Sequence, residues 1–256
     1  MLDFLARVGR VFFAFLTAAG RLALFALNAL SHCLRPPFYP RLMARQLIDI
    51  GYYSLPVVGL TALFTGMVLA LQSNTGFSRV NAQGAIALIV AVAVTRELGP
   101  VIASLMVAGR IGAAMAAEIG TMRVTDQIDA LTTLATNPFK YLVVPRLVAG
   151  TIAVPMLVLV ADIIGIFGGF LVGTYKLNFN AAAYLGQTAD YLHRDDVVSG
   201  LVKAAVFGFI IALMGCYHGY HSRGGAEGVG AATMYSVVSA SILILVFDSA
   251  LTNVLF

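Results

Sequence analysis

Long apolar stretches dominate the chain, and polar residues gather in the short segments between them. A helix that crosses a membrane needs about 20 mostly apolar residues, because each residue adds about 1.5 Å and the hydrocarbon layer is about 30 Å thick. The pattern therefore predicts an all-α integral membrane protein. Five windows approach or exceed the required length and predict five transmembrane helices: Gly51–Leu71, Gly84–Met115, Leu147–Tyr175, Val198–Cys216 and Thr233–Val254.

Residues 1–35 follow a different pattern. Polar side chains such as Arg10, Arg21 and Asn28 recur at intervals that gather them on one face of a helix, and apolar side chains occupy the other face. This pattern predicts an interfacial helix that lies in the membrane plane and ends at a cluster of prolines. A cleaved leader is the alternative, because Arg7 and Arg10 precede an apolar run.

Composition excludes an ordinary soluble domain, because 60% of the 256 residues are hydrophobic and only 11% are charged. We expect one permease domain over residues 1–256, with its transmembrane region at 49–256. The two cysteines, Cys33 and Cys216, both fall near the same predicted side, so we expect no disulfide.

Basic residues are distributed unevenly between the two predicted sides of the membrane. This asymmetry predicts a cytoplasmic N-terminus and, after five crossings, a periplasmic C-terminus. The net charge of +4 then suits anionic lipids and requires no nucleic acid. The basic residues on the predicted cytoplasmic side are Arg7, Arg10, Arg21, Arg35, Arg41, Arg45, Arg110, Arg123, Lys140, Arg146 and Arg223, and those on the outer side are Arg79, Lys176, Arg194 and Lys203.

Two charges, Arg96 and Glu97, interrupt the second apolar window. An ionisable residue at this depth costs about 2.5–3.5 kcal/mol on insertion scales and is usually paired and functional. Neighbouring residues on a helix point about 100° apart, so these two side chains cannot simply pair with each other. The Arg96 guanidinium suits a phosphate group, but a structural role inside the subunit is equally open. Gly99-Pro100, directly after them, predicts a kink that faces the protein interior.

Other polar and small residues allow more than one interpretation. Glycines spaced by four residues from Gly165 to Gly173 favour close helix packing, either at a dimer seam or within one subunit. The loop at 176–197 is polar, and we expect its residues, Asp196 among them, to be solvated or to touch an outside partner. Asp248 in the last window suits a hydrogen-bonded contact between helices.

The segment at 118–136 is the richest polar stretch on the predicted cytoplasmic side. Thr125 or Asp126 can cap a short helix that Asn137-Pro138 terminates. Its apolar edge suits either a groove in a partner or the subunit's own surface, and consists of Ile128, Leu131 and Leu134. The chain contains no GxxxxGK[ST] phosphate loop, so ATP hydrolysis would need a separate polypeptide, and we expect no metal or other cofactor.

Several of these strings, in order and spacing, resemble the MlaE-type (YrbE-like) permease family. They include Arg96–Val101, Ala108–Arg110, Ala117–Arg123 and Asp126–Ile128, and the resemblance covers about residues 20 to 256. It implies a homodimeric permease, without a catalytic site of its own, in an ABC transporter of a bacterial inner membrane. Family members work with a cytoplasmic ATPase dimer, often a STAS-domain protein, and a periplasmic ring of MCE-domain subunits, and they move phospholipid between the inner and outer membranes.

The resemblance also implies roles for individual residues. Leu69, Gln72, Arg96 and Glu97 would line or support a lipid pocket between two subunits. A coupling helix seated in the ATPase would include Glu118, Gly120, Met122, Arg123, Asp126, Gln127, Ile128 and Leu131. Two rival functions remain open: an ion-coupled secondary transporter of a hydrophobic or anionic substrate, suggested by the charges within the apolar windows, and a scaffold that anchors cytoplasmic proteins.

Overall fold

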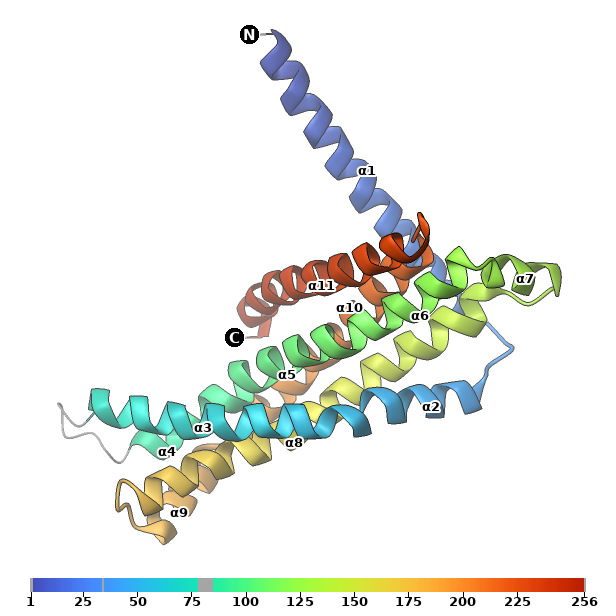
Figure 1. Ribbon diagram of the computed structural model, residues 1–256. Coiled ribbons are helices and arrows are strands. Elements are labelled where there is room, and N and C mark those ends of the chain that lie inside the picture. Colours follow the sequence, from blue (N-terminus) through green and yellow to red (C-terminus); the bar gives the residue numbers. More distant parts are fainter. Residues whose placement is uncertain (1, 34, 78–84, 256) are drawn as a thin grey trace.

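The computed structural model describes residues 2–33, 35–77 and 85–255, with side chains described in these ranges except at 2–8, 11 and 15 (Figure 1). Arg79 and the side chain of Arg7, both counted in the charge asymmetry, therefore lie outside the described residues. The described chain is almost entirely helical. Its main α-helices are α1 (Leu2–Cys33), α2 (Pro40–Ile50), α3 (Leu55–Phe77), α4 (Ile86–Ala93), α5 (Gly99–Val107), α6 (Ala113–Val124), α7 (Gln127–Thr133), α8 (Val144–Tyr175), α9 (Ala181–Tyr191), α10 (Arg194–Tyr220) and α11 (Gly225–Leu255).

Within the described ranges, six helical stretches are long and apolar enough to cross a membrane. Four of them contain a window predicted from the sequence, and Ile86–Val124 contains the described part of Gly84–Met115 except Ala85, which confirms these windows as long apolar helices. The sixth lies in α1. These stretches are Phe12–Cys33, Pro40–Phe77, Ile86–Val124, Phe139–Tyr175, Arg194–Tyr220 and Gly225–Leu255.

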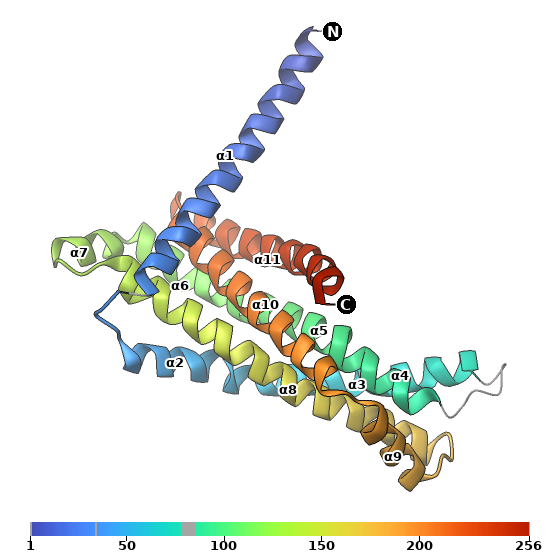
Figure 2. The same cartoon turned by 180° about the vertical axis from the view of Figure 1, so that it is seen from behind.

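Helix α1 stands apart from the other long helices. In both views its N-terminal half projects away from the bundle, and only its C-terminal half meets the bundle, near α7 (Figures 1 and 2). Phe25 is 6% exposed and contacts Phe139 and Tyr217, with ring centroids 5.1 and 5.5 Å apart. Phe12 is 58% exposed, and the interfacial placement of this helix stays a prediction.

The glycine stripe of α8 packs inside the subunit. A Cβ on Gly66 of α3 would lie 1.8 Å from the carbonyl oxygen of Gly165, so only glycine permits this approach. Further along, the Tyr184 ring of α9 covers Gly173. Burial also raises the pKa of Tyr184 to about 12. Of the two interpretations of the stripe, packing within one subunit is the one that the fold uses.

The second apolar stretch is one continuous helix with π-helical turns at Val94–Leu98 and Ala108–Gly112. The first of these turns directly precedes Gly99 and Pro100. A π-turn inserts one extra residue and is a recognised way for a helix to absorb a proline or a functional site. The predicted irregularity is therefore present at the predicted place, and Thr95, Gly99 and Pro100 are buried, as expected for a distorted backbone at membrane depth.

Candidate functional site

The π-turn at Val94–Leu98 directs Arg96 and Glu97 toward α10. Arg96 Nε lies 2.5 Å from Asp196 Oδ1, and Lys203 Nζ lies 2.7 Å from Glu97 Oε2. Arg96 and Glu97 thus do not pair with each other, as expected, and each has its own partner on α10. We refer to these four residues, with Asp248 and Thr252 of α11, as the charged cluster.

Lys203 is the centre of the charged cluster and has no exposed surface. Besides Glu97, its ammonium lies 3.1 Å from Asp248 Oδ1 and donates to Thr252 Oγ1 at 2.7 Å. It also donates to the backbone carbonyl of Arg96 at 3.2 Å. Pro100 has no N–H to offer the carbonyl four residues before it, so the lysine supplies a donor that proline removes from the helix.

Sequence reasoning misplaced two members of the charged cluster. Asp196 was expected in a solvated loop, but it is 2% exposed, and its Oδ2 also accepts the N–H of His193 at the start of α10. Lys203 was counted with the outer basic residues, but it is fully buried. The signal for Lys203 was available, because it is a lone cation inside the apolar window Val198–Cys216. For Asp196, only the contact with Arg96 reveals its role.

Each ion pair joins one buried partner to one partly exposed partner. The side chains of Arg96 and Glu97 are 37% and 39% exposed, whereas those of Asp196 and Lys203 are 2% and 0% exposed. The buried partners therefore hold Arg96 and Glu97 in place while leaving part of each accessible. This arrangement can present a guanidinium and a carboxylate to a polar ligand.

An open groove of about 380 Å³ lies beside this π-turn, on α3. Leu69 and Gln72, two of the four residues that the resemblance implied for one pocket, line this groove, whereas Arg96 and Glu97 are not part of its lining. Leu98, one residue after Glu97, connects the two features. The remaining lining is mostly apolar, and Phe64 and Val68 are 56% and 54% exposed.

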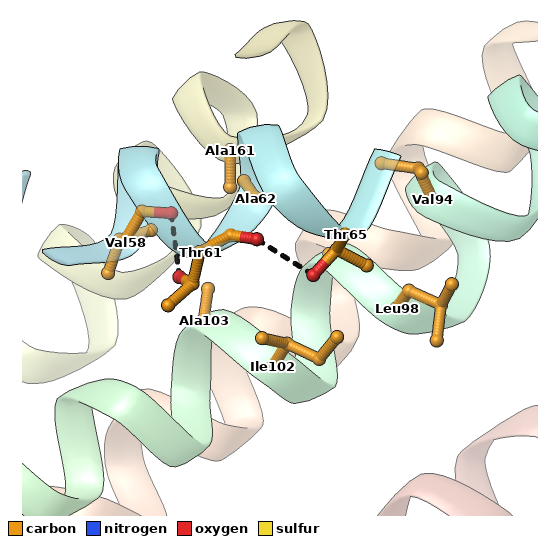
Figure 3. Close-up of a pocket in the computed structure, with 10 residues that line it drawn as sticks. Val58, Thr61, Ala62, Thr65, Val94, Leu98, Ile102, Ala103 and Ala161 are labelled. Carbon is orange, nitrogen blue, oxygen red and sulfur yellow. Dashed lines mark hydrogen bonds between the residues drawn. The ribbon is translucent and has the colours of Figure 1, made fainter. Parts of the chain in front are cut away.

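The contact between α3 and the π-turn is tightly packed. A cavity there has a volume of about 10 Å³. Thr61 and Thr65 of α3 and Val94 and Leu98, at the two ends of the turn, are among the residues that line it (Figure 3). Both threonine hydroxyls donate to carbonyls of their own helix, so the lining is effectively apolar. A cavity of this size holds at most one water.

Asp162 of α8 is a buried carboxyl next to Gly99, at the end of the π-turn. It is 4% exposed, and neither of its oxygens has a hydrogen-bond partner in the described ranges. Gly99 lies against it, because a Cβ on that glycine would be 2.0 Å from Asp162 Oδ1. The close contact explains the glycine before Pro100 and leaves an apolar surrounding for the carboxyl.

The segment at 118–136 is not a single helix. Glu118, Gly120, Met122 and Arg123 form the end of α6, and α7 begins only at Gln127. Asp126 occupies the predicted capping position, but its side chain makes no capping hydrogen bond, because its backbone is left-handed with a φ of 57°. The side-chain cap predicted for Asp126 is therefore wrong.

The predicted apolar edge of α7 is divided between two environments. Ile128 is 1% exposed and belongs to the subunit's own core, with Leu131 packed against it. Leu134, just after α7, is 74% exposed. Asp126 and Gln127 are also exposed, so the surface that α7 offers to a partner is mainly polar.

Ion pairs stiffen both flanks of α7. Arg123 Nη1 lies 2.7 Å from Asp129 Oδ1 and ties the end of α6 to α7 itself. Arg146 Nη2 lies 2.8 Å from Glu118 Oε2 and ties the start of α8 to α6. A force on α7 would consequently reach both long helices that flank it.

Comparison with known proteins agrees with this architecture. The family model described as "Permease MlaE" matches residues 43–254. A "Probable ABC transporter permease protein" of Rickettsia felis is 56% identical over 256 residues, covering 100% of this chain and 99% of the relative. The "Intermembrane phospholipid transport system permease protein MlaE" of Haemophilus influenzae is 32% identical over 257 residues, covering 100% and 98%. "Protein TRIGALACTOSYLDIACYLGLYCEROL 1, chloroplastic" of Arabidopsis thaliana is 37% identical over 212 residues, covering 83% and 61%.

Proposed function

The chain belongs to the MlaE permease family of ABC transporter permeases, and on that premise we propose that it moves phospholipid between the inner and outer membranes of a diderm bacterium. It acts as a multi-pass subunit of the inner membrane, and ATP hydrolysis is supplied by a separate cytoplasmic ATPase dimer. The observation that carries the proposal is an apolar groove that reaches the π-turn at Leu98, together with two partly exposed, firmly held charges, Arg96 and Glu97, on the same turn. The name of the Haemophilus relative, which specifies phospholipid, supports the substrate class.

In this proposal, acyl chains occupy the groove and the headgroup reaches the charged cluster. Leu69 and the other apolar residues of the groove suit hydrocarbon, and Gln72 offers an amide at its outer end. Arg96 can donate paired hydrogen bonds to a phosphate, and Glu97 can accept from a headgroup donor. Asp196 and Lys203 are positioning residues, because they hold these two side chains without being exposed themselves.

A second copy of the chain would close the groove. Along α3, a stripe of large apolar side chains is exposed: Val57 at 45%, Leu60 at 57%, Phe64 at 56% and Val68 at 54%. Their spacing of three or four residues places them on one face of the helix. A homodimer with α3 at its seam would cover this stripe and enclose the lipid between the two subunits.

Coupling to the ATPase occurs at the segment 118–136, on the side that the basic residues assign to the cytoplasm. Asp126 and Gln127 are the exposed contacts that we expect to seat in the ATPase. Closure of the ATPase dimer would push on α7, and the ion pairs at Arg123 and Arg146 would transmit the movement to α6 and α8 as a rigid-body shift. The outer end, with α9, would face the ring of MCE-domain subunits, and a STAS-domain protein would join the ATPase.

The lipid site is tested by counting the phospholipid that purifies with the chain. Arg96→Ala should lose most of the bound lipid, whereas Arg194→Ala, an exposed arginine at the start of α10, should retain it. Equal lipid content in the two variants would refute the assignment and would favour a scaffold.

The coupling site is tested by association with the ATPase. Replacing Asp126 and Gln127 by tryptophan should abolish co-purification of the ATPase, whereas Asp190→Trp on the exposed surface of α9 should not. Retained association would argue against this interface. Lipid transport that persists without any ATPase and stops when an ion gradient is dissipated would instead establish a secondary transporter.

A further inference from the structure

The end of α6 and the start of α8 lie at the end of the bundle that carries α7, away from α9 (Figure 1), and a further cavity is lined by residues of these segments and of α2. Its volume is about 420 Å³, and it opens between α2, the end of α6 and the start of α8. We refer to it as the α2 pocket. Its polar lining consists of Arg45, Gln46, Asp49, Glu118 and Arg146.

Two arginines and two carboxylates line the α2 pocket, and one arginine is already paired with one of the carboxylates. Arg146 is 4% exposed and already holds Glu118, with Nη2 to Oε2 at 2.8 Å, and the carbonyl of Leu142, at 2.7 Å from Nη1. Arg45 is exposed and Asp49 is half-buried, one helical turn apart on α2, and within the described ranges no hydrogen bond or ion pair joins their side chains. The pocket therefore presents one guanidinium and one carboxylate that are not engaged with each other.

The geometry points to a binding site for a zwitterionic phospholipid headgroup, with the phosphate on Arg45 and the ammonium on Asp49. Guanidinium groups bind phosphate through charge-assisted hydrogen bonds, and a carboxylate does the same for an ammonium. A purely basic pocket at this side of a membrane favours anionic lipids, whereas two arginines with two carboxylates favour a headgroup that carries both charges. The volume lies within the usual range for small ligands.

A lipid suits this pocket better than a soluble phosphate ester. The same helix, α2, exposes Ile48 at 54%, and Tyr52, just after it, is 67% exposed, so the polar pocket adjoins surface that acyl chains would cover. Met122 and Leu142 supply apolar contacts inside the pocket itself. This site goes beyond the proposed function, because it is separate from the groove on α3 and from the charged cluster.

Native mass spectrometry of the full-length chain in detergent tests the inference, with dioleoylphosphatidylethanolamine as the probe and dioleoylphosphatidylglycerol as the comparison. Arg45→Ala and Asp49→Asn should each weaken binding of the ethanolamine lipid by about tenfold, as expected for loss of a charged hydrogen bond. Arg41→Ala removes another exposed arginine of α2 that does not line the pocket, and it should leave binding unchanged.

Three outcomes would overturn the inference. Equal binding by Arg45→Ala and Arg41→Ala would remove Arg45 from any site. Binding of the glycerol lipid as tightly as the ethanolamine lipid would exclude a zwitterionic site. Binding of soluble phosphoethanolamine without binding of the lipid would assign the pocket to a free phosphate ester. In the Arg96→Ala background, Arg45→Ala should still weaken binding of the remaining ethanolamine lipid, so failure here and failure of the proposed function are distinguishable.

Discussion

Replacing Lys203 by methionine tests whether the charged cluster is held together by its buried lysine. The substitution keeps most of the side-chain volume but removes the ammonium that contacts Glu97 at 2.7 Å, Asp248 at 3.1 Å and Thr252 at 2.7 Å. It also leaves the carbonyl of Arg96, whose helix partner is a proline, without its donor at 3.2 Å. Two carboxylates would then face each other with no cation between them.

Removing one partner of a buried ion pair costs about 3–5 kcal/mol. The Glu97 and Asp248 side chains are 39% and 19% exposed, so water compensates part of the loss. We therefore expect Lys203→Met to lower the free energy of unfolding by about 2–3 kcal/mol. The measurement is an SDS titration of the protein in mixed micelles, followed by far-ultraviolet circular dichroism.

Two controls make this prediction specific. Lys176→Met removes an exposed lysine after α8 and should change the free energy of unfolding by no more than about 0.5 kcal/mol. Adding Glu97→Gln and Asp248→Asn to Lys203→Met should restore most of the loss, because the carboxylates no longer need a cation. The reasoning is refuted if Lys203→Met is as stable as Lys176→Met, or if the added substitutions destabilise it further.

Three further substitutions test the packing around the site. Gly66→Ala should lower the free energy of unfolding by about 1–3 kcal/mol, since its Cβ would meet the Gly165 carbonyl oxygen at 1.8 Å. Gly76→Ala is the control, because a Cβ there meets open space, and equal unfolding midpoints for the two variants would contradict the prediction. Phe25→Ala should loosen α1 and speed tryptic cleavage at the exposed Arg21, one turn before it, whereas Phe12→Ala should not. Unchanged cleavage would show that the aromatic contacts do not anchor α1. Asp162→Asn should preserve or raise the thermal midpoint of unfolding, because a buried carboxyl without hydrogen bonds is costly. A clear fall relative to the exposed control Asp190→Asn would show that the Asp162 carboxyl has a stabilising partner.

The sequence identified the elements well because the membrane imposes a simple length rule. A run of about 20 apolar residues has one stable solution in hydrocarbon, so each of the five predicted windows coincides with a long helix over nearly all of its described residues. The π-turn could be anticipated in position, since Gly99-Pro100 must disturb the helix, but the form of the disturbance could not. The segment at 118–136 was divided between α6 and α7 by a left-handed residue at Asp126, which its sequence did not signal.

What the sequence determined by itself is the set of long apolar helices and the two charges, Arg96 and Glu97, that must have partners at membrane depth. It did not predict α9, which lies in a stretch expected to be a loop. Which residues become those partners was decided by tertiary structure alone. Asp196 and Lys203 lie 100 or more positions away along the chain, and only the packing of α10 against the π-turn brings them within hydrogen-bond distance. Periodicity reports which face of a helix is polar, but it carries no information about the neighbour that this face will meet. The same limit explains why the groove on α3 and the α2 pocket emerged only from the folded chain.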